Sequence, residues 1–106
     1  MFSHNPRITC NDGFSISVQA HAGSYCTRDD SGTPIKVECG FPSTTPKTAE
    51  LRSYAEGYDG TDYTNPVHEY VNNTDYTNTV YGYVPVEVVR AELDAHGGIA
   101  FGRLPS

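Results

Sequence analysis

The 106-residue chain lacks several features that would assign it to a common protein class. No run approaches the roughly 18 consecutive apolar residues that a membrane-spanning helix needs, and the opening MFSHNPRITC has no apolar core of a signal peptide. We therefore expect a cytoplasmic protein without membrane association. GxSxG, HExxH, phosphate-loop and dinucleotide-binding glycine patterns are also missing. Their absence weighs against the common enzyme classes, and we expect no catalytic residues and no cofactor.

Basic residues are scarce, because seven Lys and Arg stand against thirteen Asp and Glu, for a net charge of −6. This balance repels both the phosphates of nucleic acid and anionic membrane surfaces. We therefore expect no direct binding of nucleic acid, and a basic protein surface as the natural partner. The length and a hydrophobic fraction of 37% predict a single domain, residues 1–106, with one modest core.

Cysteine is also sparse, and the spacing of Cys10, Cys26 and Cys39 matches neither paired CxxC zinc motifs nor a disulfide framework. Small buried thiols are the simpler interpretation, because free cysteine is among the most buried residue types. We expect no metal. A zinc site would have to combine Cys26 and Cys39 with one of His4, His21, His68 or His96. A nucleophilic pair such as Cys26 with His21 would depend on proximity in the fold.

Two segments alternate apolar and polar residues in the pattern of half-buried β-strands. In FSISVQA, residues 14–20, the apolar face carries Phe14, Ile16, Val18 and Ala20. In IKVECGF, residues 35–41, it carries Ile35, Val37, Cys39 and Phe41. The stretch RDDSGTP between them is rich in turn-forming residues, so we expect the two strands to be neighbours, with this stretch at the tip of a β-hairpin.

A further strand is predicted at residues 80–84, and a helix directly after it. Tyr81 and Tyr83 share one face of that strand, and we expect them to pack in the core or across strands. Pro85 suits the first position of a helix.

The helix is amphipathic. The apolar stripe consists of Val86, Val89 and Leu93. The side expected to face solvent, called the wet side below, carries Glu87, Arg90, Glu92 and Asp94. His96 lies in the last turn, where we expect a capping group rather than a catalytic base, and Gly97 suits the left-handed position after the helix.

These elements together predict an α+β fold, a small and mostly antiparallel β-sheet with one C-terminal α-helix packed on a face. IAFGRL, residues 99–104, could return as a short closing strand, and residues 48–56 could form a short helical turn. We expect residues 1–12 to be a loose N-terminal arm.

A doubled phrase precedes the strand at residues 80–84. Residues 61–71 and 74–84 match at eight positions, thirteen residues apart. This period is too short for the common repeat folds, and two copies are too few to stack a continuous core. We interpret the second copy as scaffold and the first as an exposed addition whose removal leaves the fold intact. The alternative is a duplication without function in a permissive loop.

Residues 55–79 are acidic and rich in tyrosine, and we expect them to form a hairpin or a loop. Between residues 55 and 85 there are five acids and no base, and seven of the eight tyrosines lie between residues 54 and 83. Carboxylates complement a basic surface, and tyrosine is enriched in binding hot spots. The expected partner-binding residues are Glu56, Tyr58, Asp59, Asp62, Tyr63, Glu69, Tyr70, Asp75 and Tyr76.

The segments FSISVQA, YC, VECGFPS, YAE, VYGYVPVEVV and HGG, spread over residues 14–98, resemble a group of small proteins encoded by bacteriophages and prophages. In that group the stretch between YAE and VYGYVP looks shorter, so the first copy of the phrase would be an insertion. The resemblance implies an inhibitor of bacterial defence in the host cytoplasm, of the anti-CRISPR type. Its partner would be the nucleic-acid-binding surface of a defence protein such as a CRISPR effector, which carboxylates engage as a DNA mimic. The resemblance brings no catalytic residues.

Two other functions stay open. A small-ligand protein, for example one that binds a nucleotide second messenger, would need basic groups in a pocket. The few available are Arg28, Lys36, Arg52 and Arg90. A structural or assembly protein of the phage particle is the second.

Overall fold

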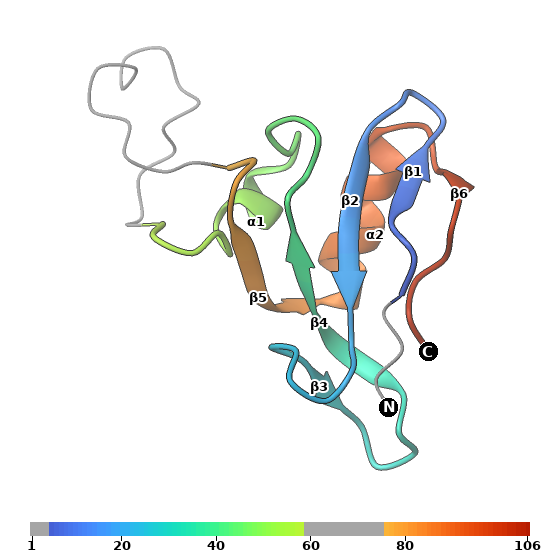
Figure 1. Ribbon diagram of the computed structural model, residues 1–106, viewed down its shortest axis with the longest axis vertical. Helices are drawn as coiled ribbons and strands as arrows, with labels where there is room; N and C mark the ends of the chain where they lie inside the picture. The colour runs from blue at the N-terminus through green and yellow to red at the C-terminus, as the bar shows by residue number, and fades with distance from the viewer. Residues whose placement is uncertain (1–4, 59–75) are drawn as a thin grey trace.

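The computed structural model describes residues 5–58 and 76–106 (Figure 1). Its elements are β1 (Ile8–Cys10), β2 (Ser15–Gln19), β3 (Thr27–Arg28), β4 (Pro34–Gly40), α1 (Ala49–Arg52), β5 (Val80–Pro85), α2 (Val86–Ala95) and β6 (Ile99–Phe101). The six strands form one sheet in which each pairing is antiparallel. The predicted α+β class is confirmed. The described residues contain two helices, where the predicted fold had one C-terminal helix. The second helix, α1, lies within residues 48–56, where a short helical turn was considered, and β6 lies within residues 99–104, where a closing strand was considered.

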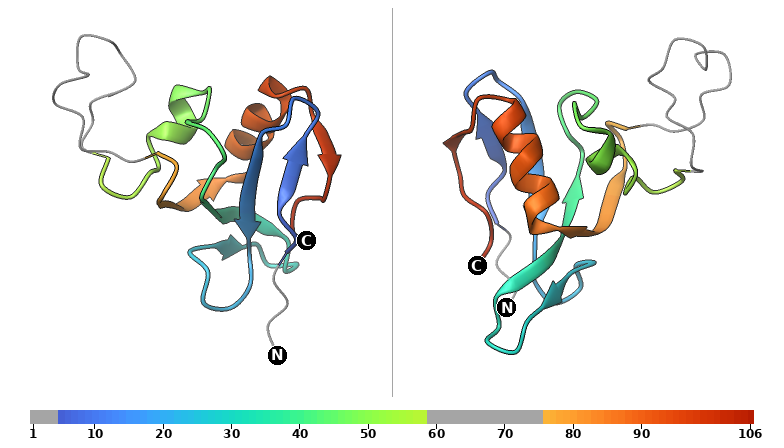
Figure 2. Two further views of the ribbon diagram at one scale, coloured as in Figure 1. Left: turned by 45° about the horizontal axis from the view of Figure 1, so that its top comes forward. Right: turned by 180° about the vertical axis from the view of Figure 1, so that it is seen from behind.

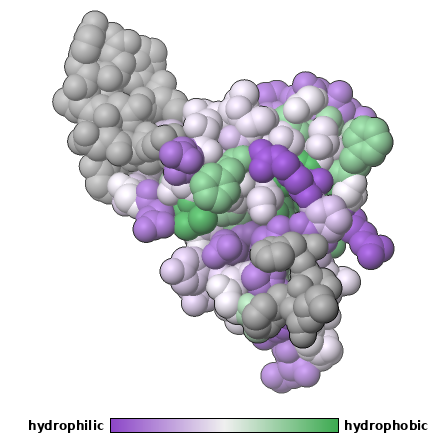
Figure 3. All heavy atoms as spheres, in the orientation of Figure 1, coloured by the Kyte–Doolittle hydropathy of each residue, from purple (hydrophilic) through white to green (hydrophobic). Residues whose placement is uncertain are grey.

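β4 is the centre of the sheet. β5 pairs along one edge of β4, while β3 and β2 pair with successive parts of the other edge, and β1 and β6 continue the sheet beyond β2. Both helices lie on the same face, behind the sheet in Figure 1 and in front of it in the right view of Figure 2. The opposite face is mostly hydrophilic, with separate hydrophobic spots (Figure 3).

The apolar face predicted for residues 14–20 is fully buried in the core, whereas the one predicted for residues 35–41 is buried only in part. The four apolar residues of 14–20 are all buried, as expected. In β4, Val37 and Cys39 are buried, but Ile35 and Phe41 are 43% and 48% exposed. Ile35 lies in the part of β4 that pairs with β3, in a hairpin that projects from the sheet (Figure 1). Phe41 follows the end of β4 with a left-handed φ of 52°, so the alternation stops before it.

The tip of this hairpin is the RDDSGTP stretch, as predicted, although it joins β3 to β4 rather than β2 to β4. The Asp29 carboxylate organises it by accepting hydrogen bonds from the backbone N–H groups of Ser31 and Thr33, at 2.9 and 3.0 Å. The Ser31 hydroxyl donates to the same carboxylate at 2.7 Å. This hydroxyl is the largest cause of the lowered pKa of Asp29.

A bulge in β5 decides which tyrosine enters the core. Val37 pairs with Val84 and Cys39 with Tyr81, so a single residue of β4 faces two residues of β5. One of the two is Tyr83, which has a left-handed φ of 52°. The extra residue reverses the alternation, so Tyr81 and Val84 are fully buried while Tyr83 is 51% exposed. The predicted core position is therefore confirmed for Tyr81 and wrong for Tyr83.

The expectation of a loose arm at residues 1–12 is wrong for its described part. Ile8 and Cys10 are buried in the core. β1, which contains them, pairs with β2 on one side and with β6 on the other. β6 comes from the far end of the chain, so local composition could not reveal the pairing that makes these residues a strand. Residues 1–4 lie outside the described residues.

α2 confirms the predicted helix and corrects one of its faces. Pro85 is the residue before the helix rather than its first residue, and Gly97 follows it with a left-handed φ of 87°. Val89 and Leu93 are buried as expected. Glu92, predicted on the wet side, has an exposed fraction of 0%. A buried carboxylate needs partners inside the protein.

Candidate functional site

Glu92 finds its partners in the loop before α1. One carboxylate oxygen of Glu92 accepts hydrogen bonds from the backbone N–H and the hydroxyl of Thr48, at 2.9 and 2.8 Å. The other accepts from the backbone N–H of Lys47 at 2.7 Å. Thr48 is also the N-cap of α1, where its hydroxyl accepts from the N–H of Leu51 at 3.3 Å. One carboxylate therefore fixes α2 to the start of α1.

His96 extends this arrangement toward the turn between β1 and β2. Its Nε2 lies 2.7 Å from Glu92 Oε2 and its Nδ1 lies 2.7 Å from Asp12 Oδ2. The Phe14 ring stacks on the imidazole at 3.8 Å between centroids, with an interplanar angle of 7°. A neutral imidazole donates from one nitrogen only, whereas the imidazolium donates from both. Each ring nitrogen of His96 lies within hydrogen-bond distance of a carboxylate oxygen.

Asp12 closes the arrangement at the surface. Its Oδ1 accepts from the backbone N–H of Phe14 at 2.9 Å, and the Lys47 ammonium lies 3.6 Å from its Oδ2. The Phe14 N–H is the main cause of a lowered pKa for Asp12, and the hydrogen bond from His96 adds to it. We call Asp12, Lys47, Thr48, Glu92 and His96 the α2 clamp. The expected capping residue His96 thus lies between Glu92 of its own helix and Asp12 of the turn between β1 and β2.

A shallow cavity of about 310 Å³ opens beside the α2 clamp. Its lining is Asp12, Gly13, Phe14, Ser43, Thr44 and His96. The hydroxyl oxygen of Ser43, which lines this cavity, accepts a hydrogen bond from the backbone N–H of Ser15 at 2.9 Å. Because both nitrogens of His96 face carboxylates, the ring cannot activate this hydroxyl in the arrangement described. The α2 clamp is a set of tertiary contacts that holds α2 to neighbouring segments, rather than a reactive centre.

A second arrangement joins the described chain on the two sides of residues 59–75, and we call it the neck. Ala55 forms an isolated β-bridge with Tyr81, and the Glu56 N–H donates to the Val80 carbonyl at 2.9 Å. Tyr76 is buried, with 4% exposed, and the Tyr81 hydroxyl donates to its carbonyl oxygen. The neck therefore consists of Ala55, Glu56, Tyr76, Val80 and Tyr81. It lies on the side of β5 away from β4.

Three of the nine expected partner-binding residues are described. Glu56 is exposed and Tyr58 is half-buried against the core, so both lie beside the neck. Tyr76 is buried, so its assignment to a binding surface is wrong. The other six lie outside the described residues: Asp59, Asp62, Tyr63, Glu69, Tyr70 and Asp75.

The doubled phrase divides as expected where the structure describes it. In the second copy Tyr76, Tyr81 and Val84 are all in the core, so this copy is scaffold. The first copy, residues 61–71, lies outside the described residues.

The cysteines are the buried thiols that were expected at two of three positions. Cys10 and Cys39 are 2% and 0% exposed, and burial is the main cause of a raised pKa for both thiols. Cys26 is half-buried and donates to the backbone carbonyl of His21 at 3.7 Å, so the contact does not involve the imidazole. Within residues 5–58 and 76–106, no group of three or more His, Cys, Asp and Glu could hold a metal ion. His4 and His68 lie outside these residues.

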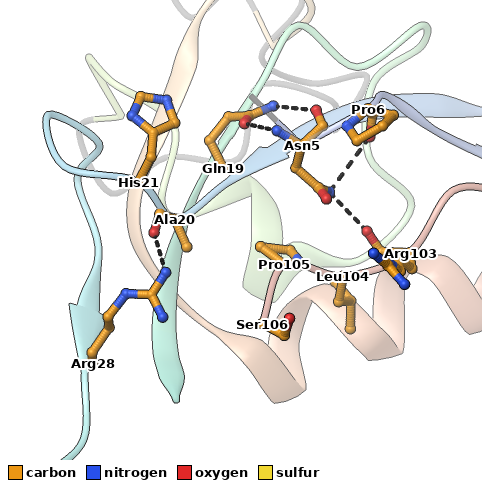
Figure 4. Close-up of a pocket in the computed structure, with 10 residues that line it drawn as sticks. All are labelled: Asn5, Pro6, Gln19, Ala20, His21, Arg28, Arg103, Leu104, Pro105 and Ser106. Carbon is orange, nitrogen blue, oxygen red and sulfur yellow. Dashed lines mark hydrogen bonds between the residues drawn. The ribbon is translucent and has the colours of Figure 1, made fainter. Parts of the chain in front are cut away.

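A second cavity of about 310 Å³ lies between the N- and C-terminal segments (Figure 4). Its walls are joined by hydrogen bonds between distant residues. The Asn5 N–H donates to Gln19 Oε1 at 2.7 Å, and Gln19 Nε2 donates back to the Asn5 carbonyl at 2.8 Å. Asn5 Nδ2 donates to the Arg103 carbonyl at 2.7 Å. Of the four bases considered for a ligand pocket, Arg28 alone lines this cavity, and it is joined by Arg103, which sequence reasoning missed.

An exposed aromatic pair was also missed. Tyr25 and Tyr83 are each 51% exposed, with ring centroids 5.8 Å apart. Gly82 makes room for the pair, because a Cβ there would lie 3.3 Å from the Cβ of Tyr25. The bulge that exposes Tyr83 has no signal in the alternation of residues 80–84, so only the pairing with β4 reveals it.

In the described part of the chain, no helix is both long and apolar enough to cross a membrane. Nothing in the described residues or in the comparisons with known proteins indicates an enzymatic activity. Those comparisons, with protein families, with curated proteins and with solved structures, found no match to this chain.

Proposed function

We propose that the protein is a phage-encoded inhibitor that binds a basic, nucleic-acid-binding surface of a bacterial defence protein. The contact would be made by the acidic, tyrosine-rich stretch of sequence between the two sides of the neck, with a target such as a CRISPR effector. The neck is the observation that supports this proposal most. It joins both ends of the segment to a packed scaffold through the Ala55–Tyr81 bridge and the 2.9 Å hydrogen bond from Glu56 to Val80.

The charge of the segment supports the same function. Residues 59–75 hold four of the thirteen acids and none of the seven Lys and Arg. Glu56 is exposed beside the neck and adds one more carboxylate. Grouped carboxylates attract a basic surface from a distance and compete with phosphate for the same Lys and Arg side chains.

The neck also lowers the entropic cost of binding. Because the neck fixes the chain on both sides of residues 59–75, fewer conformations are lost on binding than for a free peptide of the same sequence. Tyr58 packs against the core next to the neck, and its partial exposure gives the interface an aromatic side chain on the rigid side. We therefore expect the scaffold and the segment to contribute to one interface.

Matched charge variants test the proposal. The first replaces Asp59, Asp62, Glu69 and Asp75 with Asn or Gln. The second neutralises four exposed acids elsewhere in the described chain, Asp30, Glu50, Glu87 and Asp94. Both variants have the same net charge, so a difference between them reports position rather than total charge. Binding to a candidate CRISPR effector is measured by surface plasmon resonance at rising salt.

The first variant should bind at least about tenfold more weakly and show a smaller dependence of affinity on salt. The second should stay close to the unchanged protein. Equal affinities for the two variants would contradict the proposal. Affinity capture from a bacterial lysate, with the first variant as the negative control, identifies the target if the chosen effector does not bind.

A further inference from the structure

The geometry points to a second binding site, for a small phosphate-bearing anion, in the cavity between the terminal segments (Figure 4). The cavity is lined by Asn5 and Pro6, by the last residue of β2 and the two residues after it, by Arg28 of β3, and by residues 103–106. It shares no residue with the neck. The site is therefore independent of the proposed inhibitor function.

The side chains that line the cavity carry a charge opposite in sign to that of the whole protein. The chain carries a net charge of −6, yet the ten lining residues include two arginines and no aspartate or glutamate. Arg28 and Arg103 lie on opposite sides of the labelled group in Figure 4. An anion in the cavity would find guanidinium groups in the lining, whose planar donors match the oxygens of a phosphate.

Both arginines have donors to offer. Arg28 gives one hydrogen bond to the Ala20 carbonyl and one to the Gly32 carbonyl, each at 2.5 Å. A guanidinium has five N–H donors, so three remain on a group whose position these two bonds already fix. The Arg103 side chain makes no hydrogen bond or ion pair within residues 5–58 and 76–106, although its backbone carbonyl is held by Asn5. A ligand would thus gain donors without breaking the contacts of the fold.

The size of the cavity limits the ligand. About 310 Å³ is at the low end of the roughly 300–1,000 Å³ typical of small-molecule sites. It suits a phosphate or pyrophosphate group, either free or as the end of a nucleotide that extends into solvent. Pro6, Ala20, Leu104 and Pro105 supply the apolar part of the wall.

NMR titration of the ¹⁵N-labelled full chain tests this inference. Sodium phosphate, pyrophosphate and ATP are added separately at constant ionic strength, with sodium chloride as the reference. We expect saturable shifts of the Ala20, His21 and Leu104 amides, with pyrophosphate binding more tightly than phosphate. If ATP binds with the same affinity as pyrophosphate, the site accepts the terminal phosphates of a nucleotide. If ATP binds more weakly, the site is specific for the free anion.

Two arginine variants provide the control. Arg103→Gln should weaken pyrophosphate binding about tenfold, the effect of one lost charge-assisted contact. Arg90→Gln removes the same charge from the exposed side of α2, outside the cavity lining, and should leave the affinity unchanged. The proposal is overturned if none of the three anions gives a saturable shift, or if both variants weaken binding equally. Thermal unfolding of Arg103→Gln should match that of the unchanged chain, because the Arg103 side chain is exposed and makes no hydrogen bond or ion pair within residues 5–58 and 76–106.

Discussion

The α2 clamp and the neck each include a glutamate, but its carboxylate is buried in the α2 clamp and exposed at the neck. In the α2 clamp a carboxylate is fully buried and accepts hydrogen bonds from Lys47 and Thr48, with His96 against it. At the neck the carboxylate of Glu56 is exposed, and the closure depends on backbone hydrogen bonds and a buried tyrosine. The acids of the first region fasten the fold, whereas we propose that those of the second serve a partner.

This difference shows that acidity alone does not locate a binding surface. Glu92 and Glu56 are the same residue in an acidic chain, and neither has a neighbouring pattern that separates them. What separates them is whether a loop brings donors to the carboxylate. The following changes test each region in turn.

Removal of the buried carboxylate should have the largest effect. Glu92→Ala leaves two N–H groups, a hydroxyl and the His96 ring without their acceptor inside the protein. We expect the free energy of unfolding to fall by about 3–5 kcal/mol, the usual cost of breaking a buried pair. Urea unfolding followed by circular dichroism measures it. Glu87→Ala, on the exposed face of the same helix, should change stability by less than about 0.5 kcal/mol. A loss below 1 kcal/mol for Glu92→Ala would refute the clamp.

Truncation of the buried tyrosine tests the neck in the same way. Tyr76→Ala empties a core position and should cost about 3 kcal/mol, as for other large aromatic side chains in cores. Tyr83→Ala is the control, because that side chain is half exposed, and it should cost less than about 1 kcal/mol. Urea unfolding compares the two variants. Similar losses would mean that the second copy of the phrase is not scaffold.

The dependence of stability on pH tests the contribution of Asp12 to the α2 clamp. The pKa of Asp12 is lowered from 3.8 in the folded protein, so its contribution to stability is complete above that value. The contribution is lost as the pH falls through the lower folded pKa. Asp12→Asn should therefore lose stability less steeply than the unchanged protein below about pH 4. Urea unfolding at a series of pH values measures the slopes. Asp30→Asn, in the exposed hairpin tip, should keep the original slope, and identical slopes for all three proteins would exclude a role for Asp12.

Deletion of residues 61–73 should have the smallest effect on stability. The neck holds the flanking chain through contacts outside the deletion, and shortening a closed loop changes its entropy only slowly with length. We expect a change of less than about 1 kcal/mol in the free energy of unfolding, together with loss of target binding. Calorimetry and surface plasmon resonance give the two quantities. An unfolded deletion variant would show that the first copy is part of the scaffold.

The elements that could be predicted are those whose signal lies in consecutive residues. The alternation of residues 14–20 identified β2, and the stripe of Val89 and Leu93 identified α2. β1 was missed because its three residues are too short for a periodic signal. Tyr83 was misplaced because a bulge depends on the partner strand, and Arg103 was missed because its neighbours across the cavity are far away in sequence.

By itself the sequence determined the α+β class, the inward face of β2, the strand–helix unit around Pro85 and the surplus of acid before it. Tertiary structure alone decided what the polar groups do. Lys47 and Glu92 are 45 residues apart, Asp12 and His96 are 84 apart, and Asn5 and Arg103 are 98 apart. Periodicity reflects the geometry of one element, whereas the environment of a carboxylate or a guanidinium depends on which distant segments pack against it. For that reason Glu92 could be placed on a helix from its neighbours in sequence, but could be recognised as a fastening only once Thr48 was seen beside it.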